Sequence, residues 1–227
     1  MLHAIYHNKG SLWRRYIGHR DERDGNVYAE DEITSAFLGT QNFLGVNDVW
    51  RIWEVIIGKD LYPSNIKFSP ERFEIKLWPR IQIEPDALIT FFWPNNVKIL
   101  LLIEFKWNAK LSSPNQLEKQ WKEFLTKDER ENAWHLFISK DISAAVPYID
   151  KWRIIPITWL QVKSALKKVS PKKETMSNGN LVKYCNLMVK FMDKIQIRTF
   201  GGFNHLTDIP VLPNAIKEFI FFKSNKG

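Results

Sequence analysis

The sequence predicts an α/β protein in which a mixed sheet lies between helices. Helical periodicity occupies the segment before residue 58, three strand-like segments follow one another directly, and a further helix and strand come after them. The chain has 227 residues, of which 44% are hydrophobic and 26% charged, an ordinary globular composition. This length suits one large domain with smaller extensions.

Two helices are expected first. Apolar side chains recur at steps of three and four over residues 29–44, behind an acidic segment at 30–32 that suits a helix N-terminus. The same periodicity over residues 48–57 predicts the second helix. Residues 1–28 show no clean period, and we expect an N-terminal extension there.

A three-stranded meander is expected next. Residues 73–77 alternate apolar with charged side chains, as a half-buried strand does. Residues 87–93 and 97–107 are apolar and β-prone, and the Pro-Asn-Asn segment between them is typical of a turn. These two segments are therefore expected to form a β-hairpin.

Helices and strands alternate in the rest of the chain. The expected elements are a helix at 112–125, strands at 134–139 and 154–157, helices at 159–168 and 181–195, a turn at 199–203 and a short element at 215–222. Residues 167–180 are rich in Lys, Ser and Asn and form the expected linker. The expected division is an N-terminal extension at 1–28, a core at 29–168 and a basic helical C-terminal extension at 169–227.

Positive charge is concentrated toward the C-terminal end. Residues 151–227 contain 14 Lys and Arg against 4 Asp and Glu, a net charge of +10, whereas the first 150 residues have a net charge of −2. This asymmetry indicates a polyanionic partner such as nucleic acid, although solvated lysines explain it almost as well. The lysines expected to contact a nucleic-acid backbone are Lys163, Lys167, Lys168, Lys172 and Lys173.

Several classes of protein are excluded by what the chain lacks. Its one cysteine, Cys185, excludes an internal disulfide and a Cys-x-x-Cys site. The longest apolar run, residues 99–103, is far too short for a membrane span, and the first residues do not have the pattern of a signal peptide. A cytoplasmic protein without membrane contact is therefore expected.

Two charged residues interrupt the otherwise apolar second strand of the hairpin. Glu104 and Lys106 lie two positions apart and so share one face, with Phe105 on the other. If the turn is centred on Asn95, opposed residues have numbers that sum to 190, and Asp86 faces Glu104. Two facing carboxylates repel unless a cation lies between them, and Mg²⁺ is a hard divalent cation that prefers oxygen ligands.

A Pro-Asp dipeptide ending at Asp86, followed by the triplet Glu104-Phe105-Lys106, resembles the PD-(D/E)xK nuclease superfamily. The order of helix, three-stranded meander, helix and strand over residues 29–140 is similar to the restriction-endonuclease-like core of that family. The resemblance implies that Asp86 and Glu104 bind Mg²⁺ or Mn²⁺ and that the carbonyl of Phe105 adds a ligand. It further implies that Lys106 orients or activates the attacking water.

Two further catalytic residues are implied by the same resemblance. Many members of the family use a glutamate on the first helix, for which we choose Glu32, with Glu30 and Asp31 as rivals. Several members carry a glutamine on the helix after the lysine strand, which corresponds to Gln116. A tyrosine often follows that glutamine four residues later, where this chain has Gln120.

The expected function is that of a metal-dependent nuclease acting on DNA, of the restriction, defence, mobile-element or repair type. One alternative is a nucleic-acid-binding subunit that needs a partner to cut, and another is an interaction module in which the acids form only ion pairs. A homodimer is compatible with the resemblance, because double-strand cutters commonly use two active sites.

A second acid-x-Lys triplet, Glu74-Ile75-Lys76, is a weaker candidate for the metal site. It lacks an acidic residue at the head of an adjoining hairpin, and its apolar and charged residues alternate as in a solvated strand.

Overall fold

The computed structural model describes residues 27–58, 61–62, 66, 68–79, 83–107, 111–149, 151–170 and 179–197. The chain divides into two compact units, residues 1–197 and 198–227, and every described residue lies in the first. Most of the expected N-terminal extension, the expected turn at 199–203 and the expected element at 215–222 lie outside the described residues.

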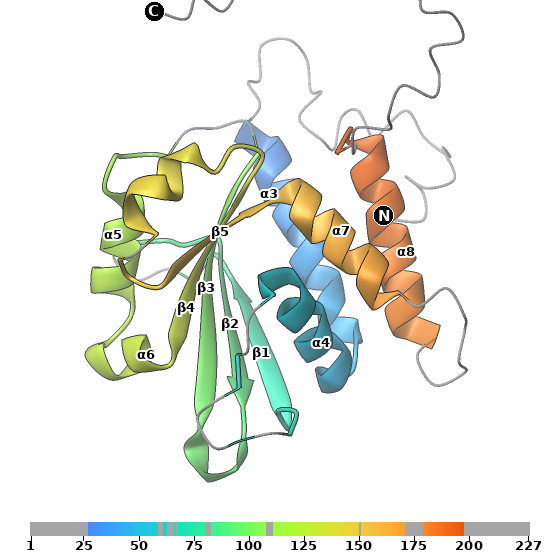
Figure 1. Ribbon diagram of the computed structural model, residues 1–227, viewed down its shortest axis with the longest axis horizontal. Helices are drawn as coiled ribbons and strands as arrows, with labels where there is room; N and C mark the ends of the chain where they lie inside the picture. The colour runs from blue at the N-terminus through green and yellow to red at the C-terminus, as the bar shows by residue number, and fades with distance from the viewer. Residues whose placement is uncertain are drawn as a thin grey trace, which may run out of the picture. The chain divides into compact units, whose positions relative to one another are not determined.

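The described residues form a five-stranded mixed sheet whose strands follow one another in chain order. The strands are β1 (Arg72–Leu77), β2 (Ala87–Phe92), β3 (Lys98–Lys106), β4 (Ala133–Ser139) and β5 (Ile154–Thr158). The first three form an antiparallel meander, whereas β3, β4 and β5 are parallel (Figure 1). The α/β class and the mixed sheet are confirmed, and the carboxyl ends of the three parallel strands lie at one edge.

The β2–β3 hairpin has the register that the sequence predicts. Ala87 pairs with Ile103, and every further pair toward the turn also sums to 190. The turn itself contains two residues in the left-handed region, Asn95 with φ 59° and Asn96 with φ 61°. Asparagine tolerates this conformation because its short polar side chain can bond to the local backbone, so the two asparagines suit the turn.

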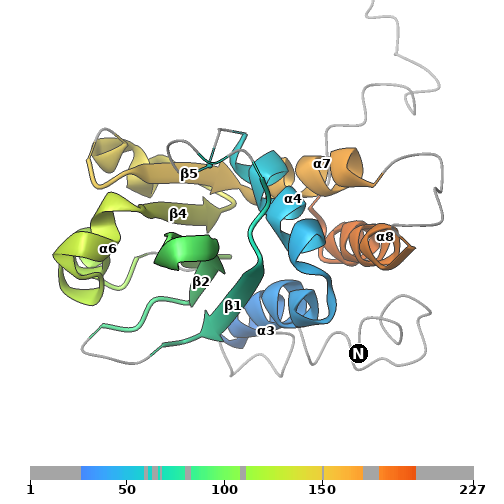
Figure 2. The ribbon, with the colours of Figure 1, turned by 90° about the horizontal axis from the view of Figure 1, so that it is seen from below.

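Helices cover both faces of the sheet (Figure 1 and Figure 2). On one face lie α3 (Val27–Leu38), α4 (Val46–Ile57), α7 (Trp159–Val169) and α8 (Gly179–Lys194), and on the other lie the short helices α5 (Gln116–Lys119) and α6 (Lys127–Glu131). The side chains of β3 alternate between these layers. Leu101, Ile103 and Phe105 join the core formed with the four longer helices, whereas Leu100 and Leu102 pack against the segment that follows α5.

The helix expected over residues 112–125 is shorter and less regular than predicted. α5 ends at Lys119 and continues as a π-type turn, η3 (Gln120–Phe124), and α6 was not predicted from the sequence. α6 begins with a capping box, in which Thr126 and Glu129 each accept a hydrogen bond from the other's backbone N–H. The π-type turn changes the direction of the side chains from Gln120 onward.

Helix α8 belongs to the same core as the sheet. Its buried side chains, among them Leu181, Cys185 and Met188, join the hydrophobic cluster formed with α3, α4 and α7. The first compact unit accordingly ends after Ile197, whereas the expected boundary lay near residue 168. The lysines of this amphipathic helix, Lys183, Lys190 and Lys194, lie on its exposed side, so composition alone did not reveal its packing.

Candidate active site

Glu104 and Lys106 form a buried ion pair at the carboxyl end of β3. Lys106 Nζ lies 2.7 Å from Glu104 Oε1, and only 1% of Glu104 and 7% of Lys106 is exposed. The alternation of β3 places both side chains on one face, as the sequence predicts, and α5 covers that face. Charges are costly to bury unless they are paired and hydrogen-bonded, so this pair needs further partners.

Two glutamines supply those partners from the segment after β3. Gln116 Nε2 on α5 donates to Glu104 Oε1 at 2.7 Å, and Gln120 Nε2 at the start of η3 donates to Oε2 at 2.6 Å. Ser112 N–H donates to Gln116 Oε1 at 2.8 Å, which fixes the orientation of that amide. Both oxygens of the Glu104 carboxylate therefore accept hydrogen bonds from neutral donors in addition to the ion pair.

Asp86 lies beside this pair, at the residue that precedes β2. Its Oδ2 accepts a hydrogen bond from the backbone N–H of Phe105 at 2.6 Å, and its carbonyl accepts one from Trp78 N–H at 2.9 Å. The hairpin register, continued by one residue beyond Ala87, places Asp86 opposite Glu104. The structure therefore brings Asp86 to the same end of the hairpin as the Glu-x-Lys triplet.

The chemistry of these donors fits a magnesium ion. Asp86 and Glu104 are carboxylates, and the expected third protein ligand is the carbonyl oxygen of Phe105. Within the described residues no group of three or more His, Cys, Asp and Glu side chains is placed to hold a metal. Mg²⁺ is commonly bound through one or two carboxylates while water and phosphate oxygens fill its remaining positions, so a pair of carboxylates suits it better than a dedicated protein cage.

The acid expected on the first helix lies in α3. The side chains of Glu30 and Glu32 fall outside the described part of the structure, and Asp31 is exposed. α3 packs through Phe37 against the ring of Phe105, with the ring centroids 6.3 Å apart, on the face of the sheet opposite Glu104. A catalytic role for Glu32 remains a prediction.

His135 extends the site on the neighbouring strand β4. Its Nε2 lies 3.2 Å from Gln120 Oε1, and its ring stacks on Trp121 at a centroid distance of 6.2 Å. The side chain is fully buried, which lowers its pKa to about 3 and keeps the ring neutral. His135 was not among the residues predicted for the site. A histidine within an apolar strand is nevertheless a signal, because burying it requires a polar partner.

Aromatic side chains pack around the carboxyl end of β3 on the face of the sheet opposite Glu104. Trp159, the first residue of α7, donates from Nε1 to the carbonyl of Lys106 at 3.1 Å and stacks on Phe105 at a centroid distance of 5.1 Å. Trp107 meets Trp159 edge-on, and Lys140 Nζ lies 3.8 Å above the ring of Trp107. Partial burial lowers the pKa of Lys140.

One of the lysines expected to contact nucleic acid is buried instead. Lys163 is 2% exposed and bonds through Nζ to Asp193 Oδ1 at 2.5 Å and to the carbonyl of Ile197. The prediction for Lys163 is therefore wrong, because this lysine joins α7 to α8. Lys167 and Lys168 are exposed in the last turn of α7, about 12 Å along the helix from Trp159. The other two, Lys172 and Lys173, lie outside the described residues.

The second acid-x-Lys triplet lies on the edge strand β1. Glu74 and Lys76 form an ion pair of 3.5 Å, with 47% and 55% of their side chains exposed. An exposed pair of this kind contributes little to stability. The contrast with Glu104 and Lys106 makes this triplet a matched control.

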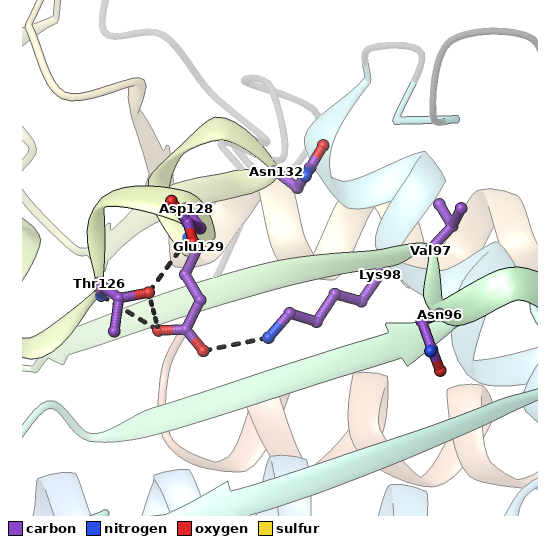
Figure 3. Close-up of a pocket in the computed structure, with 7 residues that line it drawn as sticks. All are labelled: Asn96, Val97, Lys98, Thr126, Asp128, Glu129 and Asn132. Carbon is purple, nitrogen blue, oxygen red and sulfur yellow. Dashed lines mark hydrogen bonds and ion pairs between the residues drawn. The ribbon is translucent and has the colours of Figure 1, made fainter.

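A pocket of about 670 Å³ lies at the opposite end of β3 (Figure 3). Glu129 lies between Thr126 and Lys98, and its carboxylate is 3.2 Å from Lys98 Nζ. Burial alone would raise the pKa of Glu129, but hydrogen bonds from Thr126 and Lys98 outweigh it and lower the pKa. Because Lys98 and Lys106 are the two ends of a nine-residue strand, roughly 26 Å separates the pocket from the candidate site.

Comparison of the chain with protein-family models, with curated proteins and with solved structures found no match. Within the described part of the chain, none of the helices has the length and apolar character that crossing a membrane requires.

Proposed function

We propose that this protein is a metal-dependent nuclease that hydrolyses phosphodiester bonds, with DNA as its substrate. The observation that carries the proposal is the buried Glu104–Lys106 pair, which lies at the carboxyl edge of the parallel strands with Asp86 at the facing register position. Ligand sites of α/β proteins commonly lie at that edge. A buried ion pair contributes little to stability by itself, so its retention in an apolar strand favours a role in chemistry.

Each residue has a role in this proposal. Asp86, Glu104 and the Phe105 carbonyl would hold Mg²⁺ or Mn²⁺, and such an ion, when bound, neutralises charge on a phosphate and lowers the pKa of a water molecule. Lys106 supplies a positive charge beside the carboxylate and orients the water or a phosphate oxygen. Gln116 holds Glu104 from α5. The exposed lysines of α7 attract the polyanion in a manner that depends on salt.

The proposal is tested by incubating the protein with supercoiled plasmid and with labelled single-stranded DNA in the presence of Mg²⁺, Mn²⁺ or EDTA. Metal-dependent cleavage by the wild type is expected, with losses of about 100-fold or more in Asp86→Asn, Glu104→Gln and Lys106→Met. The control variants Glu74→Gln and Lys76→Met alter the exposed triplet and should keep the wild-type rate. An equal loss of cleavage rate in the site variants and the control variants would contradict the assignment. So would cleavage by Glu104→Gln at the wild-type rate.

The hydrogen bonding of Glu104 favours one alternative function. Both of its oxygens already accept hydrogen bonds from Gln116 and Gln120, and within the described residues only Asp86 joins it as a second carboxylate. A subunit that binds nucleic acid but needs a partner to complete the site would have this arrangement. Fluorescence anisotropy with labelled DNA separates the two, because such a subunit binds DNA without cutting it under any metal condition.

A further inference from the structure

The side chains around Glu104 form a hydrogen-bonded chain that crosses from β3 to β4. Gln120 Nε2 donates to Glu104 Oε2 at 2.6 Å, and Gln120 Oε1 lies 3.2 Å from His135 Nε2. Both Gln120 and His135 are completely buried. Water therefore has no access with which to replace either bond, so a variant that removes one of them leaves a buried polar atom without that partner.

The direction of every proton in this chain follows from the carboxylate. An ionised carboxylate only accepts hydrogen bonds, so Gln120 must present its NH₂ group to Glu104 and its oxygen to His135. An amide oxygen only accepts as well, so His135 must carry its proton on Nε2. His135 Nδ1 has no hydrogen-bond partner among the described residues, which disfavours a second proton on the ring.

We propose that His135 is a positioning residue, whose Nε2–H holds the Gln120 amide in the one orientation that donates to Glu104 and thereby fixes the metal-binding carboxylate. This inference rests on the proposed function in assigning Glu104 to a metal. Without the donor on His135, Gln120 Oε1 loses its buried partner, so the amide is held by Glu104 alone and can shift away from the carboxylate. The stack of the His135 ring on Trp121 keeps Nε2 aimed at Gln120.

The place of Gln120 in the fold supports this role. Gln120 is the first residue of the π-type turn η3, and its side chain reaches Glu104 beside that of Gln116, which belongs to the preceding α-helical turn. π-type turns are rare and recur at functional sites. Partners that orient the ligands of a metal typically change affinity or activity 10- to 100-fold when they are mutated.

Three variants test the proposal in the full chain. His135→Phe keeps a ring to stack on Trp121 but removes the donor, and His135→Gln places an amide N–H at about the reach of Nε2. Tyr184→Phe is the matched control. It also removes two buried hydrogen bonds, one donated to the Phe37 carbonyl and one accepted from Gln41, but it lies on α8 at the opposite face of the sheet. The measurements are kcat and KM for DNA cleavage, the Kd for Mn²⁺, and NMR of the His135 ring and the Gln120 side-chain amide.

For His135→Phe we expect a 10- to 100-fold loss in kcat or in Mn²⁺ affinity with KM for DNA unchanged, and recovery to within about threefold in His135→Gln. Tyr184→Phe should leave all three constants unchanged. In the wild type, the ring nitrogens should show the neutral form protonated on Nε2, and the Gln120 amide protons should be protected from exchange only while His135 is present.

A wild-type ring protonated on Nδ1, or a Gln120 amide that stays equally protected in His135→Phe, would overturn the proposal. So would a His135→Phe variant that cleaves DNA and binds Mn²⁺ like the wild type. If the wild type neither cleaves DNA nor binds metal, the proposed function fails, while the two NMR measurements still decide whether His135 positions Gln120.

Discussion

Removing the Lys106 charge should destabilise the protein far more than removing the Lys76 charge from the matching triplet. In Lys106→Met the apolar stem is retained, so the change isolates the ammonium group. Breaking a buried pair by removing one partner costs about 3–5 kcal/mol, because the other charge is left buried. Glu104 keeps the hydrogen bonds from Gln116 and Gln120, so we expect the lower end of that range, about 3 kcal/mol.

Urea unfolding followed by tryptophan fluorescence measures this difference. For an m-value of about 2–3 kcal/mol/M, a loss of 3 kcal/mol lowers the midpoint by about 1–1.5 M. Lys76→Met, whose pair is half exposed, should cost no more than about 0.5 kcal/mol. The double variant Lys106→Met with Glu104→Gln should recover at least about 1 kcal/mol relative to Lys106→Met, because the unpaired charge is then gone.

The reasoning is refuted if Lys106→Met and Lys76→Met have equal free energies of unfolding. It is also refuted if the double variant is as unstable as the sum of its two single changes. Either result would mean that Glu104 and Lys106 are not coupled as a buried pair.

Three further predictions concern buried groups, whose burial determines a pH dependence, the stability of an ion-pair variant and the reactivity of a thiol. The pKa of His135 falls from 6.5 to about 3 on folding, so between these two pH values the unfolded chain binds more protons than the folded one. The contribution of His135 to stability is therefore present above pH 6.5 and is lost as the pH falls toward 3. His135→Phe should therefore flatten the pH dependence of the unfolding free energy by about 1.4 kcal/mol per pH unit between pH 6 and 4, and an unchanged slope would contradict the burial. Asp193→Asn should cost more stability in urea than Lys163→Met, since Lys163 is buried whereas Asp193 is half exposed, and the reverse order would argue against the packing of α8 on α7. Burial raises the pKa of the Cys185 thiol to about 12, so a thiol reagent at pH 8 should label the native protein only as fast as the protein unfolds, and rapid labelling would contradict that burial.

Local chemistry was enough to predict the hairpin and the residues at its end. The Pro-Asn-Asn turn and the period of two along each strand set the register, so the sequence alone predicts Asp86 opposite Glu104. The same period placed Glu104 and Lys106 on one face. These predictions depend only on residues close in sequence, joined by one short turn.

The partners of Glu104 depended on contacts that no short-range pattern encodes. The resemblance named Gln116 and gave Gln120 only as the residue that stands where a tyrosine often follows. The change to a π-type turn, and the sheet face that this segment covers, were set by packing against Leu100 and Leu102. His135 reaches Gln120 only because β4 pairs in parallel with β3, through a crossover connection.

The packing of helix α8 against the core was also not predictable from the sequence. Its lysines and the preceding linker-like segment suggested a separate basic extension, and the burial of Lys163 against Asp193 was equally hidden. A charged residue is read from the sequence as exposed, since most are, and only a specific partner from another helix reverses that expectation.

The sequence alone determined the α/β class, the hairpin register and the chemical types gathered at its end, because period and turn chemistry act over a few neighbouring residues. The tertiary structure alone decided that Gln120 and a neutral histidine join Gln116 around Glu104, and that α8 completes the core. Those outcomes depend on which faces meet across the sheet, and that choice is made by the packing of the whole chain rather than by any one segment.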